Sequence, residues 1–392
     1  MKDELFRRLE PVDRSFFLFG ARGTGKSTWL RQKLPEAIRF DLLRSSVQLE
    51  LMASPDRLEA LIGDRPSGTW ILLDEVQKAP GLLAEVHRLI EEKNWRFALC
   101  GSSARKLRRG GADLLAGRAL TLTMEPFSFA ELGDRFHLDQ ALEWGMLPVV
   151  WSDLSLAPDI LSAYLDTYLR EEIREEGAVR NLAPFVRFLA IAGQIHGQAL
   201  NMQNISRDAG VPRSTTEAYF SVLQDTLVAG LLPAWRPNLK VREAAHPKFY
   251  WTDSGVARAA TGLLRDPVDR AWKGASLESL IFHELRCYNT WGGNLRPLSY
   301  YRTAAGVEID FIIETVRRME DAPARVVCIE AKLSPRWDRK WESAMRGLRA
   351  TPGIEVEKMI GVYTGTQTYR FDDLDVFPVE VFRRRLHAGE IF

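Results

Sequence analysis

The sequence lacks the features that mark secreted, disulfide-stabilised or membrane-spanning proteins. Its 392 residues include only three cysteines, and Cys100, Cys287 and Cys328 are scattered without the spacing of metal ligands. A sparse, odd set of cysteines indicates a reducing compartment and no disulfide framework. The first residues form no apolar signal core, and no apolar run is long enough to cross a bilayer. We therefore expect a cytoplasmic protein with no membrane partner.

An excess of charge of one sign is also lacking, because the formal net charge is only +1. Nothing attracts the whole molecule to nucleic acid or to a membrane, so a site for a polyanion has to be a local patch. Internal repeats and low-complexity linkers are not found in the sequence either. The length exceeds that of a usual single domain, so we expect two or three domains.

The pattern of apolar residues divides the chain into three regions. Residues 1–155 alternate short apolar strands with helical stretches, which indicates an α/β domain with a parallel sheet. Residues 156–268 have apolar residues at helical spacing, and residues 269–392 form a second α/β region. The expected strands are 16–19, 37–42, 69–73, 96–100 and 119–124 in the first region, and 298–302, 307–313 and 325–331 in the last.

The first expected strand leads into a glycine-rich segment with the P-loop pattern G-x-x-x-x-G-K-[ST]. Glycines let backbone N–H groups turn toward phosphate oxygens, and the next helix begins there with its positive end. Lys26 can reach the β- and γ-phosphates of ATP, and the Ser27 hydroxyl can bind Mg²⁺. A chance glycine-rich turn is the alternative. The expected nucleotide contacts are Gly20, Arg22, Gly23, Thr24, Gly25, Lys26, Ser27 and Thr28.

Acidic residues end the third expected strand. Asp74 would hold the Mg²⁺, and Glu75 is placed to polarise the attacking water. An acidic turn is the alternative for this pair taken by itself. The fourth expected strand is followed by Ser102 and Ser103, one of which could sense the γ-phosphate, with Ser102 our choice. A serine that caps a helix is the alternative there.

Three arginines are candidates for an arginine finger, a residue that stabilises charge in the transition state. They are Arg118, Arg170 and Arg174. A finger supplied in trans would imply a homo-oligomer. Each of them taken alone also fits a solvated surface arginine.

The middle region contains a helix-turn-helix pattern at residues 204–216, with Gly210 in the turn. The second helix, at about 213–224, would place Arg213, Ser214 and Thr215 where such a motif faces the major groove of DNA. Packing of domains or contact with another protein is the alternative role. Two later strands, near 229–235 and 248–252, would form a wing with Lys240, Arg242 and Lys248.

The last region begins with a helix expected at 276–288. Glu278 shares a face of this helix with Ile281 and Leu285, so that a carboxylate lies along an apolar stripe. Glu284 lies on a different face, and we expect it at the surface.

Two strands add further polar residues. Asp310 points away from the strand face on which Val307, Ile309, Phe311 and Ile313 alternate. Glu330 and Lys332 are two positions apart and project to the same side of the last expected strand. A helix acid, a strand acid and an E-x-K motif have the layout of PD-(D/E)xK nucleases, in which carboxylates hold Mg²⁺ or Mn²⁺ and the lysine orients water. The alternative is a scattered set of acids with a surface E-x-K.

Taken together, these motifs resemble those of the prokaryotic AAA-type (ASCE) ATPases that carry a C-terminal DUF4143 region. The resemblance covers nearly the whole chain. It implies an ATPase module, a winged helix and a restriction-endonuclease-like domain. Cys100 departs from the family pattern, because a polar residue such as threonine is more usual before the sensor segment. The motifs that carry the resemblance are residues 20–28, 71–78, 101–103, 115–118, 208–215, 274–278, 300–311 and 329–332.

Two functions are compatible with these patterns. The first is an oligomeric ATPase that translocates on or remodels duplex or branched DNA, as a helicase or translocase does. The second is an ATP-dependent conformational switch with C-terminal protein-interaction modules. In either case the expected catalytic residues are Lys26, Glu75 and Arg118, with Lys332 at the C-terminal site. The expected metal ligands are Ser27 and Asp74 at the P-loop, and Glu278, Asp310 and Glu330 at the C-terminal site, where we expect weak cleavage at best.

Overall fold

The structure is a computed structural model, and it describes residues 6–102, 115–169, 182–236, 246–303, 305–319 and 322–392. Several residues that the sequence singled out lie outside these ranges, and they are Ser103, Arg170, Arg174, Lys240 and Arg242. None of the described helices is both long and apolar enough to span a membrane.

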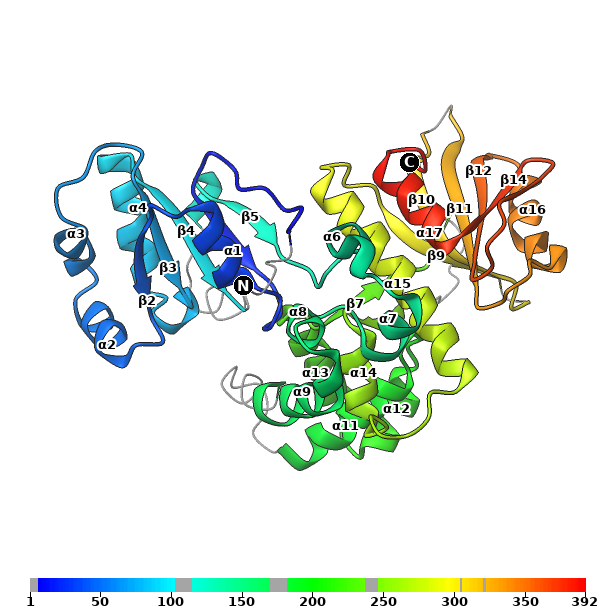
Figure 1. Cartoon of the computed structure of the whole chain (residues 1–392), viewed down its shortest axis with the longest axis horizontal. Coiled ribbons are helices and arrows are strands. Elements are labelled where there is room, and N and C mark those ends of the chain that lie inside the picture. Colours follow the sequence, from blue (N-terminus) through cyan, green and yellow to red (C-terminus); the bar gives the residue numbers. More distant parts are fainter. Residues whose placement is uncertain (1–5, 103–114, 170–181, 237–245, 304, 320–321) are drawn as a thin grey trace.

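The N-terminal part is a parallel sheet with the strand order β2-β3-β4-β1-β5 (Figure 1). Each strand lies within one residue of its expected bounds, which confirms this part of the α/β prediction. The strands are β1 (Phe16–Phe19), β2 (Ile38–Asp41), β3 (Trp70–Asp74), β4 (Arg96–Gly101) and β5 (Leu120–Thr123).

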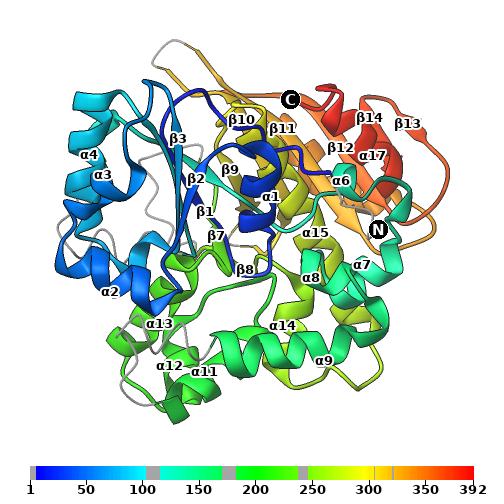
Figure 2. The ribbon, with the colours of Figure 1, turned by 60° about the vertical axis from the view of Figure 1, so that its left-hand side comes forward.

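The strand β1 is apolar at every position, so its side chains must be buried on both faces of the sheet. Helices cover both faces. Phe16 and Leu18 pack in one core with Trp29 of α1 (Lys26–Lys33). Phe17 and Phe19 pack in the opposite core. Helices α2 (Ser45–Ala53), α3 (Arg57–Ile62) and α4 (Leu82–Lys93) cover that second face, at the end of the molecule away from the C-terminal domain (Figures 1 and 2).

The middle part is mainly helical. It contains a small antiparallel sheet of β6 (Gln198–Ala199), β8 (Lys248–Trp251) and β7 (Ala229–Leu232), in that order. A π-helical turn at Tyr164–Leu169 follows α9. The helices are α6 (Phe129–Leu132), α7 (Leu138–Trp144), α8 (Pro148–Trp151), α9 (Ala157–Ala163), α11 (Leu182–Gln194), α12 (Met202–Ala209), α13 (Arg213–Asp225) and α14 (Ser254–Thr261).

The C-terminal part is a mixed sheet with the order β13-β14-β12-β11-β10-β9. Helices α15 (Arg270–Trp291) and α17 (Val379–His387) pack on one face, and α16 (Ser343–Arg349) packs on the other. The strands are β9 (Leu298–Arg302), β10 (Glu308–Val316), β11 (Ala324–Lys332), β12 (Ile354–Tyr363), β13 (Tyr369–Phe371) and β14 (Leu374–Pro378).

The prediction that the apolar residues of β10 share one face is wrong. A bulge shifts the register between Ile309 and Ile312. As a result Ile309 and Ile312 pack in the core under α16, whereas Phe311 and Ile313 pack in the core under α15. Val307 lies before the strand and is exposed.

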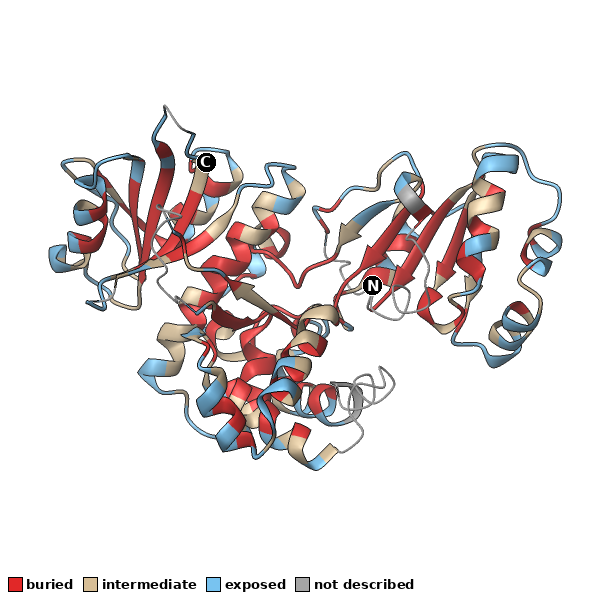
Figure 3. Cartoon of the chain, turned by 180° about the vertical axis from the view of Figure 1, so that it is seen from behind, coloured by how far each residue is buried: buried red, intermediate tan, exposed pale blue. Residues whose placement is uncertain are grey.

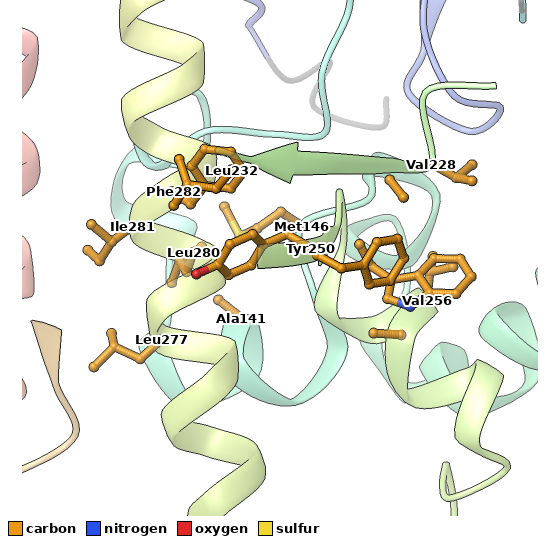
Figure 4. Packing of buried hydrophobic residues seen from close by; sticks show 14 of the residues in the cluster. Ala141, Met146, Val228, Leu232, Tyr250, Val256, Leu277, Leu280, Ile281 and Phe282 are labelled. Carbon is orange, nitrogen blue, oxygen red and sulfur yellow. The ribbon is translucent and has the colours of Figure 1, made fainter. Parts of the chain in front are cut away.

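One apolar core joins the middle and C-terminal parts. It runs from Phe127 to Ile391, and Figure 3 shows buried positions in both parts. The rings of Tyr250 and Phe282 pack within it with their centres 4.8 Å apart (Figure 4). Ala21 of the P-loop also belongs to this core. The domain boundaries at 155 and 268 stay predictions.

Glu284 lies at the junction, and the expectation that it is a surface acid is wrong. Its side chain is fully buried. Its Oε1 accepts a hydrogen bond of 2.7 Å from the Phe129 amide, and its Oε2 lies 3.0 Å from His387 Nε2. Arg8 Nη1 lies 3.1 Å from the other ring nitrogen of His387. These contacts join the N-terminal segment, α6 and α17, which are distant in sequence.

Candidate functional site

The glycine-rich segment forms a tight loop between β1 and α1. Gly23 and Gly25 have φ angles of 77° and 89°, in the left-handed region where a side chain would be strained. Gly25 is the N-cap of α1, and a Cβ built on it meets no atom within 4 Å. The start of α1 therefore has room beside Gly25 and no side-chain cap, and the N-terminus of a helix suits a phosphate group.

Lys26 is folded back onto this loop. Its side chain is buried, and Nζ donates hydrogen bonds of 2.7 Å and 3.1 Å to the carbonyl oxygens of Gly20 and Ala21. The Thr24 hydroxyl donates a bond of 2.7 Å to the Ala21 carbonyl. The ammonium group is thus held at the mouth of the loop, where it can turn toward a bound phosphate.

Ser27 and Asp74 line one pocket of about 320 Å³ beside the loop. They meet because β1 and β3 are parallel, so that their carboxyl ends lie at the same edge of the sheet. The buried Oδ1 of Asp74 has no hydrogen-bond partner. A buried carboxylate oxygen without a partner destabilises the folded protein unless a cation binds to it. These two side chains therefore fit a Mg²⁺ ion.

Glu75 follows Asp74 in a strained backbone conformation, with φ 59° and ψ 45°. Its carboxylate accepts a hydrogen bond from the Gln77 side chain, and Gln77 Nε2 also donates to Ser102 Oγ at 3.2 Å. The expected water-polarising acid and the expected γ-phosphate sensor are therefore connected through Gln77. Sequence reasoning missed this residue, although it lies only two positions after Glu75.

Arg118 lies at the opposite edge of the sheet from the P-loop. Leu120, two residues later, pairs with Phe16, the first residue of β1, whereas the P-loop follows Phe19, the last one. The Arg118 guanidinium pairs with Glu91, and it lines a second pocket of about 410 Å³. It therefore cannot reach the nucleotide site of its own chain.

The N-terminal site has the parts that ATP and Mg²⁺ require. Lys26 and the first amides of α1 would hold the phosphates, with the remaining expected contacts, Gly20, Arg22 and Thr28, on the same loop and first helical turn. Ser27 and Asp74 would hold the Mg²⁺, which when bound neutralises phosphate charge. That Glu75 orients and polarises the attacking water stays a prediction.

The helix-turn-helix pattern forms α12 and α13, with Gly210 in the left-handed conformation between them. Arg213 and Ser214 are exposed at the start of α13, and Thr215 is half-buried. Arg213 forms an ion pair of 2.8 Å with Glu217 on the same helix. This end of α13 is thus accessible to a partner.

The four C-terminal residues predicted from the sequence come together. The Asp310 carboxylate accepts a bond of 2.8 Å from the Ala331 amide and lies 3.5 Å from Lys332 Nζ. Lys332 also pairs with Glu330. Glu278 reaches the cluster from α15, where it approaches Asp310 closely enough for their charges to interact.

Three residues that sequence reasoning did not assign to this cluster complete it. Lys248, which we expected between or beside the strands of the wing, is buried, with Nζ 2.7 Å from Glu278 Oε1 and 2.5 Å from Glu308 Oε1. Tyr250 donates its hydroxyl hydrogen bond to the same Glu278 oxygen, and Figure 4 shows this hydroxyl directed toward α15. Lys248 and Tyr250 alternate on β8, which is the only sequence signal that could have linked them.

Burial and mutual repulsion change the charge of this cluster. Burial, followed by the charge of Asp310, raises the pKa of Glu278 to about 7 and that of Glu330 to about 8. Burial lowers the pKa of Lys248, but the surrounding carboxylates outweigh this effect and raise it. In the described part of the chain, no three acidic, histidine or cysteine side chains are arranged to hold a metal ion. The residues as they stand therefore do not fit the predicted metal.

Comparison with known families assigns the three parts of the chain. The AAA domain family matches residues 12–133, which include β1 to β5, the P-loop and Asp74. A domain of unknown function, DUF4143, matches residues 273–382, which include the acidic cluster. The chain belongs to the AAA-type ATPases with a C-terminal DUF4143 domain. Between the two, another domain of unknown function, DUF8612, matches residues 135–266.

Relatives of this AAA protein occur in bacteria and archaea. An uncharacterized protein of Haemophilus influenzae is 26% identical over 62% of this chain and 62% of its own length. The match thus spans less than two thirds of that relative. An uncharacterized protein of Methanocaldococcus jannaschii is 22% identical over 76% of this chain and 71% of its own length.

The chain has only weak similarity to solved structures. The ORC1 protein of Aeropyrum pernix in complex with DNA matches 64% of this chain and 86% of its own, with 12% identity and a TM-score of 0.25. A protein of Vibrio cholerae matches 95% of this chain and 96% of its own, with 12% identity and a TM-score of 0.20. These scores are too low to indicate a shared overall fold.

Proposed function

We propose that this chain is an ATP-hydrolysing, DNA-processing protein. In this proposal an oligomer of AAA domains translocates on or remodels duplex or branched DNA, and the middle and C-terminal parts hold the DNA as a winged helix and a nuclease-like domain. The observation that carries the proposal is direct contact between the P-loop and the middle part. A Cβ built on Gly23 would lie 3.2 Å from Val149 Cγ1 and 3.7 Å from the Tyr164 ring.

This contact gives hydrolysis a mechanical route. Val149 lies on α8 and Tyr164 follows α9, and both helices belong to the core that also contains α12 and α13. Tyr164 is buried, so a P-loop that changes shape when phosphate binds or leaves would press on its ring, because interiors are close-packed. The exposed start of α13 would then move with the nucleotide state. Arg213 and Ser214 supply the local positive and polar surface that a chain of net charge +1 needs for DNA.

The test is the rate of ATP turnover with and without duplex, forked and four-way junction DNA at low salt. We expect stimulation by at least one of these DNAs, and weaker stimulation after Arg213→Ala. Arg265→Ala is the matched control, because Arg265 is equally exposed and also forms a surface ion pair, with Asp159. If none of the DNAs stimulates turnover, the DNA-processing proposal is wrong.

Arg118 supports an oligomer, since it can act only on the nucleotide of another subunit. We expect Arg118→Ala and Glu75→Gln to be inactive alone. In a mixture of both, an intact site on one subunit can meet an intact arginine on the next, so roughly a quarter of the interfaces regain function. Recovery of phosphate release on mixing tests the role of Arg118. A mixture as inactive as its components would remove Arg118 from the site.

A conformational switch without DNA is the second candidate, because the same Gly23 contact could simply report whether ATP is bound. It predicts slow hydrolysis that DNA does not alter, together with a nucleotide-dependent shape. Limited proteolysis and light scattering with and without ATP measure that shape. Identical patterns in both states would exclude the switch, whatever the DNA experiment shows.

A further inference from the structure

The acidic cluster of the DUF4143 domain contains a cation that comes from outside the domain. Lys248 lies on β8 of the middle part, and its side chain is only 4% exposed. Its Nζ lies 2.7 Å from Glu278, 2.5 Å from Glu308 and 4.0 Å from Asp310. The ammonium group thus occupies the point on which acids from α15 and β10 converge.

A second ammonium group closes the other side of the cluster. Lys332 lies 3.5 Å from Asp310 Oδ2 and pairs with Glu330. Its side chain is 28% exposed, so it lies at the solvent edge, whereas Lys248 lies inside. Four carboxylates therefore share two lysines. A hard divalent cation binds through the same carboxylate oxygens, so it has to compete with Lys248 for them.

The chain that leads into Lys248 is hydrogen-bonded to the DUF4143 domain at two places. The Trp235 amide donates a bond of 2.6 Å to the Tyr300 carbonyl, and the Tyr300 amide donates one of 2.9 Å to Pro233. The Tyr300 hydroxyl donates to the carbonyl of His246, two residues before Lys248. Lys248 Nζ also lies 5.3 Å from the centre of the Tyr300 ring. Lys248 is therefore held in place by its backbone as well as by its charge.

We propose that Lys248 is a built-in cation that takes the place of a divalent metal ion in the DUF4143 acidic site and keeps that site closed to such ions. The inference does not depend on ATP hydrolysis or DNA binding. The middle part, which contacts the P-loop through Val149 and Tyr164, also supplies Lys248. The closed state of the acidic site therefore depends on a residue of β8 in the middle part.

The experiment measures Mn²⁺ binding by paramagnetic resonance and calorimetry in full-length protein without nucleotide. Every variant carries Asp74→Asn, which removes the other cation site. We expect no Mn²⁺ at the DUF4143 site with Lys248 present. We expect Lys248→Met to bind one Mn²⁺, at least roughly tenfold more tightly than its parent. Adding Asp310→Asn to Lys248→Met should abolish this binding.

Two controls separate the closing role from general effects. Lys248→Arg keeps the positive charge, so the acidic site should stay closed to Mn²⁺. Lys358→Met removes a lysine of the same domain that donates to the carbonyl oxygens of Glu390 and Ile391, and it should gain no Mn²⁺. Mn²⁺ at about 1 mM should raise the unfolding temperature of Lys248→Met and leave that of its parent unchanged.

Lys248→Met removes the cation that Glu278 and Glu308 share in a buried site, so it can fail to fold. Lys248→Met combined with Glu308→Gln removes one carboxylate charge together with the ammonium and keeps the acids at 278, 310 and 330. If this folded double variant binds no Mn²⁺, the proposal is overturned. It is equally overturned if the parent protein binds Mn²⁺ at this site as tightly as the Lys248 variants do.

Discussion

Glu75→Gln is the sharpest test of the nucleotide site. Glu75 is half-buried at the end of β3, and its carboxylate is held by the Gln77 side chain. Glutamine keeps the shape of the side chain and an oxygen that can still accept this hydrogen bond. The substitution removes the negative charge that polarises water and leaves Ser27 and Asp74 in place.

The expected loss follows from this role. A positioned general base contributes about 10²- to 10⁴-fold to the rate, which corresponds to about 2.7–5.5 kcal/mol of transition-state stabilisation. Glu75 lies outside the loop that would hold the phosphates, so we expect this loss in kcat, with the KM for ATP changed by less than about threefold. The unfolding temperature should stay the same because no packing is lost.

The assay is steady-state phosphate release over a range of ATP concentrations. Glu50→Gln is the matched control, since Glu50 lies on α2 of the same domain and forms a surface ion pair of 3.2 Å with Arg57. Its kcat should equal that of the wild type. If Glu75→Gln keeps more than about a third of the wild-type kcat, Glu75 is not the base and the site assignment is wrong.

Four further substitutions test other parts of the structure. Lys26→Ala should abolish phosphate release but leave passive DNA binding in a mobility-shift assay intact, because Lys26 lies at the P-loop and not on α13. Gln77→Leu should lower kcat by about tenfold and alter its pH profile, since it removes both bonds that position the neighbouring acid and sensor; an unchanged profile would reduce Gln77 to a packing role. Glu284→Ala should destabilise the protein by about 3–5 kcal/mol in thermal unfolding, because the buried Phe129 amide and His387 Nε2 both lose their partner, whereas Glu284→Gln should cost clearly less. His196 is buried, and burial lowers its pKa to about 3. Between pH 6.5 and 3 the unfolded chain binds a proton that folded His196 does not, so stability falls as the pH falls, by up to about 1.4 kcal/mol per pH unit. His196→Asn should remove this part of the acid sensitivity in urea unfolding, and an identical pH slope in both proteins would contradict it.

Local patterns predicted much of the fold and of the P-loop site. The bounds of β1 to β5 follow from short apolar runs, and the loop before Lys26 follows from glycine spacing, because both depend on neighbours in the sequence. Asp74 could be linked to this loop because parallel strands end at one edge of a sheet. Glu278, Asp310, Glu330 and Lys332 also come together as their order in helix and strands indicated.

Residues whose partners are distant in sequence could not be predicted in this way. Glu284 was expected at the surface of α15. It is buried because Phe129 of α6 and His387 of α17 supply its hydrogen bonds. The sequence placed Lys248 only between or beside the strands of a wing, and the tertiary structure shows that acids of the DUF4143 domain surround it. Periodicity identifies which face of an element is apolar, but it does not identify the polar groups that another domain brings to that face.

The junction between Arg8 and His387 also has a consequence for the order in which the chain matures. These residues are 379 positions apart, so a ribosome that adds 5–20 residues per second needs roughly 20–75 s to make the stretch between them. The two cores of the AAA sheet are formed by residues 9–124 and can assemble early in that time. The contact between Arg8 and His387, which joins the N-terminal segment to α17, cannot form until the end of that time. Each new chain therefore passes through an interval in which the ATP-binding part is complete while its connection to the DUF4143 domain does not yet exist.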